Sequence, residues 1–300
     1  MILSLGLAVL AAFANAGSNV LQRRANMTEP PELNLSPKLI WALLHRRDWW
    51  AGLTLVTVSF LCQAGALGTG ELAVVQPVIV LELPITLVIG GALFHSRLGR
   101  REWGAIALLS LGVSGVIGFL SPHGGEVPSG ALVWAVGAGG TAAVIALLVA
   151  LGRSRHNDVR AALFGAAGGV AFGLTAAFMK ATTTELPTGF GQVFSSWAVY
   201  AMVATGLLGM FLVQSAFHAG KLVASQPGIS LLDPFWAVAF GVLAFHEHTE
   251  HGWFIALAAA SALAMAAGAV VLSGSPAFQG TSGRQPHPDG LSSADARVGS

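Results

Sequence analysis

The fold is decided by two stretches of sequence that match each other. Residues 66–103 read ALGTGELAVVQPVIVLELPITLVIGGALFHSRLGRREW, and residues 216–253 read AFHAGKLVASQPGISLLDPFWAVAFGVLAFHEHTEHGW. The two align without a gap, and 12 of the 38 aligned positions are identical, among them two prolines, a glutamine and a tryptophan. Shared apolar composition alone would not bring such residue types into register. The chain therefore contains an internal repeat.

The charged residues of the repeat change sign between the two copies. The opposed pairs are Glu71 with Lys221, Arg97 with Glu247, and Arg100 with Glu250. This is expected if the two copies lie upside down relative to each other in a membrane. Inverted repeats are a common architecture of secondary transporters, whose binding site lies near mid-membrane where the repeats meet.

The composition is that of a membrane protein. Hydrophobic residues make up 54% of the chain and charged residues 10%, whereas a soluble domain carries about 25% charged residues. The single cysteine, Cys62, excludes disulfides, zinc ribbons and CxxC redox chemistry. We find no P-loop, GxGxxG, HExxH or nucleophile elbow, so the sequence favours neither an enzyme nor nucleic-acid binding.

Nine apolar segments reach the roughly 20 residues that a helix needs to cross a membrane. They are, approximately, 2–22, 49–69, 71–95, 102–121, 129–152, 159–180, 194–218, 221–245 and 252–273. A lipid-exposed open sheet would leave backbone groups unpaired, so we predict helices. The predicted fold is an all-α polytopic membrane protein with about nine transmembrane helices in two inverted repeats, spans 1–4 and 6–9.

The spans divide the chain into four parts. We assign residues 1–128 to the first repeat, 129–152 to a linking transmembrane helix, 153–273 to the second repeat, and 274–300 to a disordered cytoplasmic tail rich in Gly, Ser and Pro. Within the first repeat, Ser36-Pro37 is a helix start signal. The apolar residues and basic end that follow predict a short interfacial helix at about 36–47.

The basic residues predict the orientation of the chain. Of its 15 Lys and Arg residues, all but Lys180 fall on one side of the nine-span arrangement. The positive-inside rule makes that side cytoplasmic, so the N-terminus is expected outside and the C-terminus in the cytoplasm of a plasma (inner) membrane. Lys180 lies near the outer end of span 6 and is expected to extend its amine toward the interface.

Two acidic residues lie in the middle of predicted spans. Glu82 and Asp233 are each about ten residues into a span, which is about 15 Å at the rise of a helix. An ionised carboxylate there costs about 2.5–3.5 kcal/mol, so such a residue normally faces a cavity, pairs with a cation or carries a proton. The alternative is a protonated carboxyl group that donates a hydrogen bond to a neighbouring helix.

Prolines and amide side chains accompany the two acids. Proline removes a backbone hydrogen bond and frees the carbonyl four residues back, so we expect bent or broken helices and an oxygen-rich environment for a hard cation. The helix-breaking prolines are Pro77, Pro84, Pro227 and Pro234, and the freed carbonyls are those of Val80 and Ser230. The amides expected to line the path are Gln76, Gln226, Asn15 and Asn19, with interhelical hydrogen bonding as the alternative.

A histidine-rich run follows span 8 on the predicted outer side. It reads His246-Glu247-His248-Thr249-Glu250-His251. Imidazole and carboxylate groups three or four residues apart on a helix are ligands for a transition metal, so His246, His248 and His251 are candidate metal ligands. The alternative is a solvated acidic loop with titrating histidines.

Several segments of the chain carry a resemblance to a known family. They are Leu5-Gly6-Leu7-Ala8 and Asn19–Arg24 in span 1, Trp49-Trp50-Ala51-Gly52-Leu53 opening span 2, Ala64–Gly70 leading to Val74-Val75-Gln76-Pro77, Arg97–Leu111, and His246-Glu247. Over about residues 2–273 they resemble the drug/metabolite transporter superfamily, EamA-like, and most nearly the NIPA-type magnesium transporters. The resemblance implies two inverted bundles that enclose a central cavity and move by alternating access. The chain departs from many members in having nine rather than ten spans, and His95-Ser96 where an acidic residue often ends span 3.

The sequence thus predicts a secondary transporter of a small metabolite or cation, with Mg²⁺ or H⁺ as the transported or coupling ion and no bound cofactor. One alternative is a proton-coupled drug or metabolite exporter. Another, of a different class, is a non-transporting membrane scaffold or metal sensor. The expected partners are the lipid bilayer and a small-molecule or ion substrate, and a homodimer stays open as the oligomeric state.

Overall fold

The computed structural model describes residues 2–27, 45–94, 98–128, 130–186, 189–220, 222–249 and 252–275. These residues form helices and connections, with one isolated β-bridge between His123 and His248. The helices are α1 (Ile2–Met27), α3 (Arg47–Thr69), α4 (Leu72–Ile79), α5 (Glu82–Leu93), α6 (Arg100–Leu120), α7 (Ala131–Arg153), α8 (Asn157–Thr184), α9 (Phe190–Ser195), α10 (Trp197–Ala219), α11 (Leu222–Leu243) and α12 (Trp253–Ser273). The predicted all-α fold class is therefore confirmed.

Eight helical segments of the described residues are long and apolar enough to cross a membrane, by length and composition. Seven are single helices, and α4 with α5 makes the eighth, Leu72–Leu93. These are the features of a multi-pass membrane protein. The helix at the predicted span 221–245 is α11, which is 22 residues long but is not among the eight. Gln226, Asp233 and two prolines lower its hydropathy.

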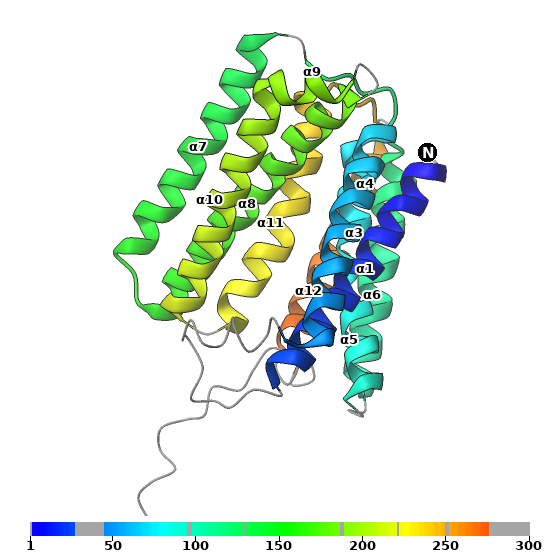
Figure 1. Cartoon of the computed structure of the whole chain (residues 1–300), viewed down its shortest axis with the longest axis vertical. Helices are drawn as coiled ribbons and strands as arrows, with labels where there is room; N and C mark the ends of the chain where they lie inside the picture. Colours follow the sequence, from blue (N-terminus) through cyan, green and yellow to red (C-terminus); the bar gives the residue numbers. More distant parts are fainter. Residues whose placement is uncertain are drawn as a thin grey trace, which may run out of the picture.

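The helices form two groups that lie side by side (Figure 1). We call one the α1 group, in which α1 packs against α3, α4 and α5, and α6 packs against α12. We call the other the α7 group, in which α8 packs against α7, α10 and α11. The groups meet where α11 contacts α4 and α12, and where α3 contacts α8.

Two corresponding glycines set how closely neighbouring helices approach. Gly70 follows α3 and Gly220 follows α10, and both have extended backbones. A Cβ at Gly70 would collide with the side chain of Ser4 at the start of α1. At Gly220 it would lie 2.6 Å from the carbonyl oxygen of Asn157 at the start of α8. Each connection is therefore packed against the start of a long helix, α1 in one group and α8 in the other.

Small residues let α8 lie directly against α11. Gly165, Gly169 and Gly173 are spaced four apart on α8, and a Cβ on each would come within 2.8 Å of an α11 atom. Such close backbone approach replaces hydrophobic association in lipid, where apolar side chains gain little by meeting each other. The contact at Gly173 is with the backbone oxygen of Asp233, which fixes the height of that acid beside α8.

The proline-containing helices of the two repeats differ. The first is interrupted between Ile79 and Glu82, where Val80 and Leu81 make hydrogen bonds of the i to i+3 type. The carbonyl of Val80 accepts a bond of 3.1 Å from the amide of Leu83, so the predicted free carbonyl is already bonded.

In the second repeat, Pro227 and Pro234 lie inside the continuous helix α11, so the predicted break is not an interruption there. A proline removes only one donor, and the turns on either side of it keep their own bonds.

Two predicted segments lie outside the described residues. They are the interfacial helix at 36–47, of which only 45–47 is described, and the tail 274–300, of which only Gly274 and Ser275 are described. The short helix α9 was not predicted.

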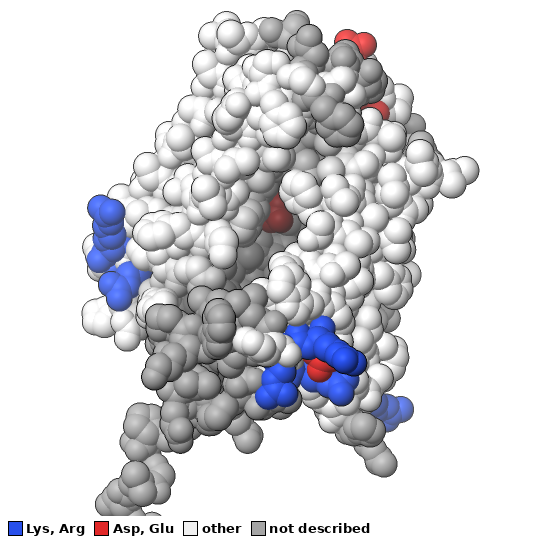
Figure 2. Space-filling model, in the orientation of Figure 1, with Lys and Arg blue, Asp and Glu red and all other residues white. Residues whose placement is uncertain are grey.

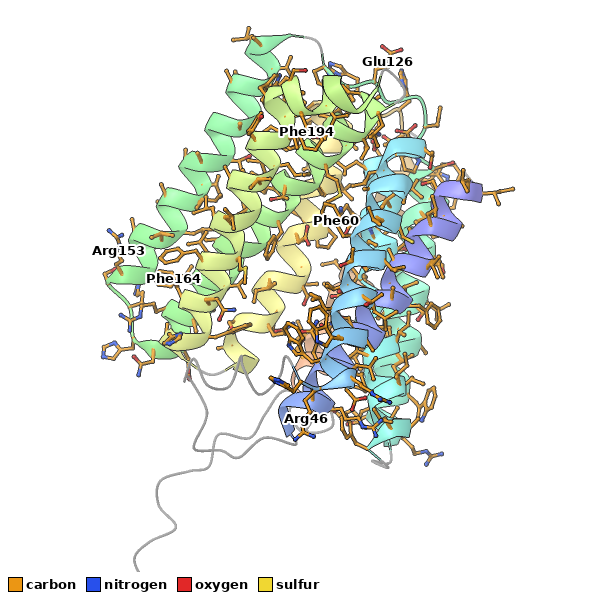
Figure 3. The ribbon with its side chains drawn as sticks, viewed as in Figure 1. Arg46, Phe60, Glu126, Arg153, Phe164 and Phe194 are labelled. Atoms are coloured by element: carbon orange, nitrogen blue, oxygen red, sulfur yellow. The ribbon has the colours of Figure 1, made fainter. Side chains whose placement is uncertain are left out.

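The two ends of the molecule differ in charge. Figure 3 shows Glu126 at the upper end of the view and Arg46 and Arg153 toward the lower end. We use upper end and lower end in this sense below. On the visible face, Lys and Arg side chains gather toward the lower end (Figure 2).

Candidate functional site

A hollow opens between the two groups of helices, roughly halfway along them, and an acidic side chain lies at its floor (Figure 2). Two carboxyl groups come from mid-helix positions, Glu82 as the first residue of α5 and Asp233 from the middle of α11. They are close enough to interact electrostatically. We call them the central carboxylates. Neither residue is fully buried or fully exposed, as expected for side chains that line an internal hollow.

The helix interruption positions Glu82. Because α4 ends at Ile79, Glu82 stands at the start of a new helix, where the positive end of the helix dipole favours a carboxylate. Asn15 of α1 donates a hydrogen bond from its side-chain amide to Glu82. Asn15 and Glu82, both predicted from the sequence, are thus brought together by the packing of α1 against α5.

Asp233 has less support. Its Oδ1 atom is buried and has no hydrogen-bond partner among the described residues. A buried oxygen of this kind costs about 1–3 kcal/mol, and more when it is charged, unless a ligand, an ion or a proton satisfies it. The central carboxylates therefore hold more acceptor capacity than the described side chains around them use.

The other predicted path residues differ in their surroundings. Gln76 is 2% exposed, and its Nε2 has no partner among the described residues. Gln226 is half-buried and donates a long bond of 3.5 Å to Ser230 in its own helix. Asn19 is exposed. On α1 the inward-facing neighbour is Ser18, which donates to the carbonyl of Gly52.

A second polar cluster, not predicted from the sequence, lies near the upper end. Lys180 of α8 is 5% exposed, so the expectation that its amine extends to the interface is wrong. Its Nζ lies 3.0 Å from Oε2 of Glu71 and 2.8 Å from Oε1 of Glu247. We call Lys180, Glu71 and Glu247 the upper network.

Glu247 also caps a distant helix. Its carboxylate accepts hydrogen bonds from the amides of Leu72 at 2.6 Å and Ala73 at 3.0 Å, the first residues of α4. Glu71, directly before α4, makes no cap of its own and instead accepts a bond of 3.4 Å from the amide of Gly125. The free amides and the dipole at a helix N-terminus favour a negative charge. The N-terminus of α4 therefore helps to compensate the negative charge of two carboxylates that share one lysine.

The two glutamates of the upper network have opposite pKa shifts. Burial raises the pKa of Glu247, although Lys180 opposes this. For Glu71, burial acts in the same direction, but the hydrogen bond and charge of Lys180 prevail and leave its pKa below the ordinary value. Glu247 is therefore the first of the two to take up a proton as the pH falls.

Two glycines make room for this network. A Cβ at Gly241 would lie 2.5 Å from Oε2 of Glu247, and one at Gly125 would collide with the side chains of Glu247 and Glu71. The sequence contained signals for the network: Glu71 and Glu247 were positions of charge reversal in the repeat, and Lys180 was the lone basic residue on its side. Their pairing could not be read from spacing, since the three come from distant parts of the chain.

The histidine run is placed beside the upper network. His248 forms the bridge with His123, and their rings stack at 6.0 Å between centroids. Glu247 turns inward to Lys180, and His251 lies outside the described residues. The described part of the chain contains no group of three His, Cys, Asp or Glu residues able to hold a metal ion.

Aromatic side chains separate the network from a surface pocket. The pocket measures about 590 Å³ and is lined by Trp134, Trp197 and Glu185, among others. Phe245 contacts Trp134 edge to face, and Lys180 Nζ lies 5.3 Å from the centroid of the Phe245 ring. On this side, the upper network is therefore shielded by rings.

Comparison with known proteins adds one relative. The chain is 29% identical over 248 residues to an uncharacterized protein of Corynebacterium glutamicum, covering 80% of this chain and 85% of that protein. No family model and no solved structure matches the chain.

Proposed function

We propose that this protein is a secondary transporter of the drug/metabolite transporter type, which works by alternating access and carries a cation or small metabolite past Glu82 and Asp233. The observation that carries the proposal is the pair of interacting central carboxylates beside a hollow, with one buried oxygen that has no partner among the described residues. Acids at mid-membrane depth are costly, so their presence there favours a role in binding or moving a cation.

The helix packing supports an inverted-repeat arrangement. If α1, α3, α4 with α5, and α6 correspond to α8, α10, α11 and α12, each packing of the first set has its counterpart. The packing of α1 with α3 matches that of α8 with α10, and the packing of α1 with α5 matches that of α8 with α11. The contacts of α6 with α12 and of α4 with α11 then lie on the axis that relates the repeats. Transporters built this way bind their substrate where the repeats meet. The proposed topology has the upper end outside the cell, in accord with the basic lower end.

Mg²⁺ is the first substrate to test. It prefers oxygen ligands, retains several waters and is bound through one or two carboxylates. The central carboxylates and the side-chain oxygen of Asn15 are groups of that kind.

The experiment is Mg²⁺ flux into liposomes that contain the purified protein and a trapped indicator. We expect flux in the wild type and a loss of at least about tenfold, equivalent to about 1.4 kcal/mol, in Glu82→Gln and in Asp233→Asn. The matched control is Glu126→Gln, which removes an exposed carboxylate at the upper end and should leave the flux unchanged. Absence of flux in correctly inserted wild-type protein would rule out Mg²⁺ as the substrate.

A second candidate is a proton-coupled exporter of a drug or metabolite. The observation in its favour is the electrostatic interaction of the two carboxyl groups, because two carboxylates repel each other and protonation of one of them relieves that repulsion. Uptake of an organic substrate driven by an imposed pH gradient, lost in the same two variants, would distinguish it from Mg²⁺ transport.

A further inference from the structure

We propose that Lys180, Glu71 and Glu247 form the gate that closes the upper end of the transport path, and that opening this end requires the bonds of this network between the two groups of helices to break. The proposal rests on the central path described above, but it does not depend on the identity of the substrate.

The upper network joins the two groups of helices. Glu71 and the amides of Leu72 and Ala73 belong to the α1 group, whereas Lys180 belongs to the α7 group and Glu247 follows α11 of that group. The network therefore spans the contact between the groups on the upper side of the central carboxylates. If the groups move apart at this end, the ion pair of Lys180 with Glu71 and the hydrogen bonds of Glu247 to the first amides of α4 must break.

An ion pair at the lower end has a different arrangement. There the described residues contain an ion pair between Arg24 of α1 and Asp48 of α3, and both partners lie within the α1 group. At the upper end, by contrast, the ion pair of Lys180 with Glu71 connects the two groups, and Glu247 adds its hydrogen bonds to the first amides of α4. A buried ionic contact between the groups therefore lies at the upper end, as expected for a transporter closed above its site.

The upper network is also largely shielded from water. Lys180 and Glu247 are 5% and 3% exposed, and Gly125 and Gly241 allow the backbone to fit closely around the carboxylates. Above it, the bridge between His123 and His248 and the bond from the amide of Glu126 to the carbonyl of Phe245 tie the two connecting loops together. Buried charges of this kind are stable only while they are paired, so loss of one partner favours a state in which water reaches the other.

Gln76 offers a reporter position on the path. It is buried, and it lies four residues after Leu72, about 6 Å below the network along α4. With Cys62 replaced by alanine, Gln76→Cys gives a single thiol. Its rate of modification by a membrane-impermeant, positively charged methanethiosulfonate, added from each side of the membrane in turn, reports which end is open.

We expect little modification from the upper side with the network intact, and an increase of at least about tenfold in Lys180→Met and in Glu247→Gln, because one broken charge-assisted hydrogen bond corresponds to about that factor. Lys180→Arg, which keeps the charge, should restore most of the protection. Glu126→Gln, which removes an exposed carboxylate at the same end, should not change the rate.

The proposal is overturned if the rate from the upper side is the same with and without Lys180 in protein that elutes as a folded, monodisperse species. It is also overturned if Glu126→Gln raises the rate as much as Lys180→Met, since the effect would then be general loosening. No substrate is needed, so a negative flux result leaves this test intact. Conversely, a confirmed gate with no Mg²⁺ flux points to another substrate.

Discussion

The molecule buries carboxylates in two places, and they are satisfied in different ways. In the upper network two glutamates share a lysine and accept hydrogen bonds from three backbone amides, those of Leu72, Ala73 and Gly125. At the centre, Glu82 and Asp233 interact with each other, and the one hydrogen bond that they receive from a described side chain comes from Asn15. Acids with their own counterion hold a structure together, whereas acids without one keep acceptor capacity for a cation or a proton.

The largest expected effect is on the free energy of unfolding, and it distinguishes the upper network from the central carboxylates. Lys180→Met should destabilise the protein by about 3–5 kcal/mol, because it leaves the buried carboxylate of Glu247 and the half-buried one of Glu71 without their cation. Asp233→Asn removes a charge whose Oδ1 has no partner among the described residues, so it should leave stability unchanged or raise it. Thermal unfolding followed by tryptophan fluorescence would compare the two variants.

The control for this prediction neutralises the whole network. Lys180→Met combined with Glu71→Gln and Glu247→Gln leaves no unpaired charge and should recover most of the lost stability, as replacing a buried ion cluster by neutral groups often does. If Asp233→Asn lowers the unfolding temperature as much as Lys180→Met, the distinction between the two kinds of carboxylate is wrong.

The sequence was sufficient for the helices because their signal is local. The runs of apolar residues predicted the positions of all the long helices, and the approach of Asn15 to Glu82 follows from acids and amides at mid-span. The proline effect was only half predictable, since Pro77 and Pro84 flank an interruption while Pro227 and Pro234 do not. Whether a helix continues through a proline depends on its neighbours, and α8 packs closely along α11.

The upper network could not be predicted because its energy comes from contacts between distant segments. Lys180 and Glu247 are 67 residues apart, and Glu247 caps a helix 175 residues away. Read locally, Lys180 was a lysine close enough to the membrane surface to extend its amine into water, and Glu247 belonged to a histidine-rich loop. The tertiary fold instead buries both, and burial is tolerated because each supplies the other's counterion.

A smaller effect on the free energy of unfolding is expected at Gly70 and Gly220, which occupy corresponding positions in the two repeats. Gly220→Ala should destabilise the protein by about 1–3 kcal/mol, because its methyl group meets the backbone of α8, which cannot move aside. Gly70→Ala meets the side chain of Ser4 and should cost less, since that side chain can turn. Gly206→Ala, where a Cβ finds ordinary contact at 3.6 Å, is the control. Equal costs at all three glycines would contradict this account of the two connections.

The smallest expected effect is a dependence of the gate on pH. Because the pKa of Glu247 is raised and that of Glu71 is lowered, acidification protonates Glu247 while Glu71 stays ionised. That raised pKa belongs to the closed state, in which Glu247 is buried, so protonation favours the closed state over an open state in which water reaches Glu247. A gain of about 1 kcal/mol would lower the modification rate of Gln76→Cys from the upper side by roughly fivefold. Each rate is divided by that of a free thiol at the same pH, because the reagent reacts with the thiolate.

The groups that face Glu247 decide how this pH result is interpreted. They are Lys180 on α8, Glu71 and the first amides of α4, with His123 and His248 in the loops beside them. In Glu247→Gln the acid-induced fall in rate should disappear. If the fall persists there and is abolished by His248→Gln, or if acid raises the rate in the wild type, protonation of Glu247 does not stabilise the closed gate. Glu247 would then keep its charge under acid conditions. Its role in the upper network would be only to hold the two groups of helices together.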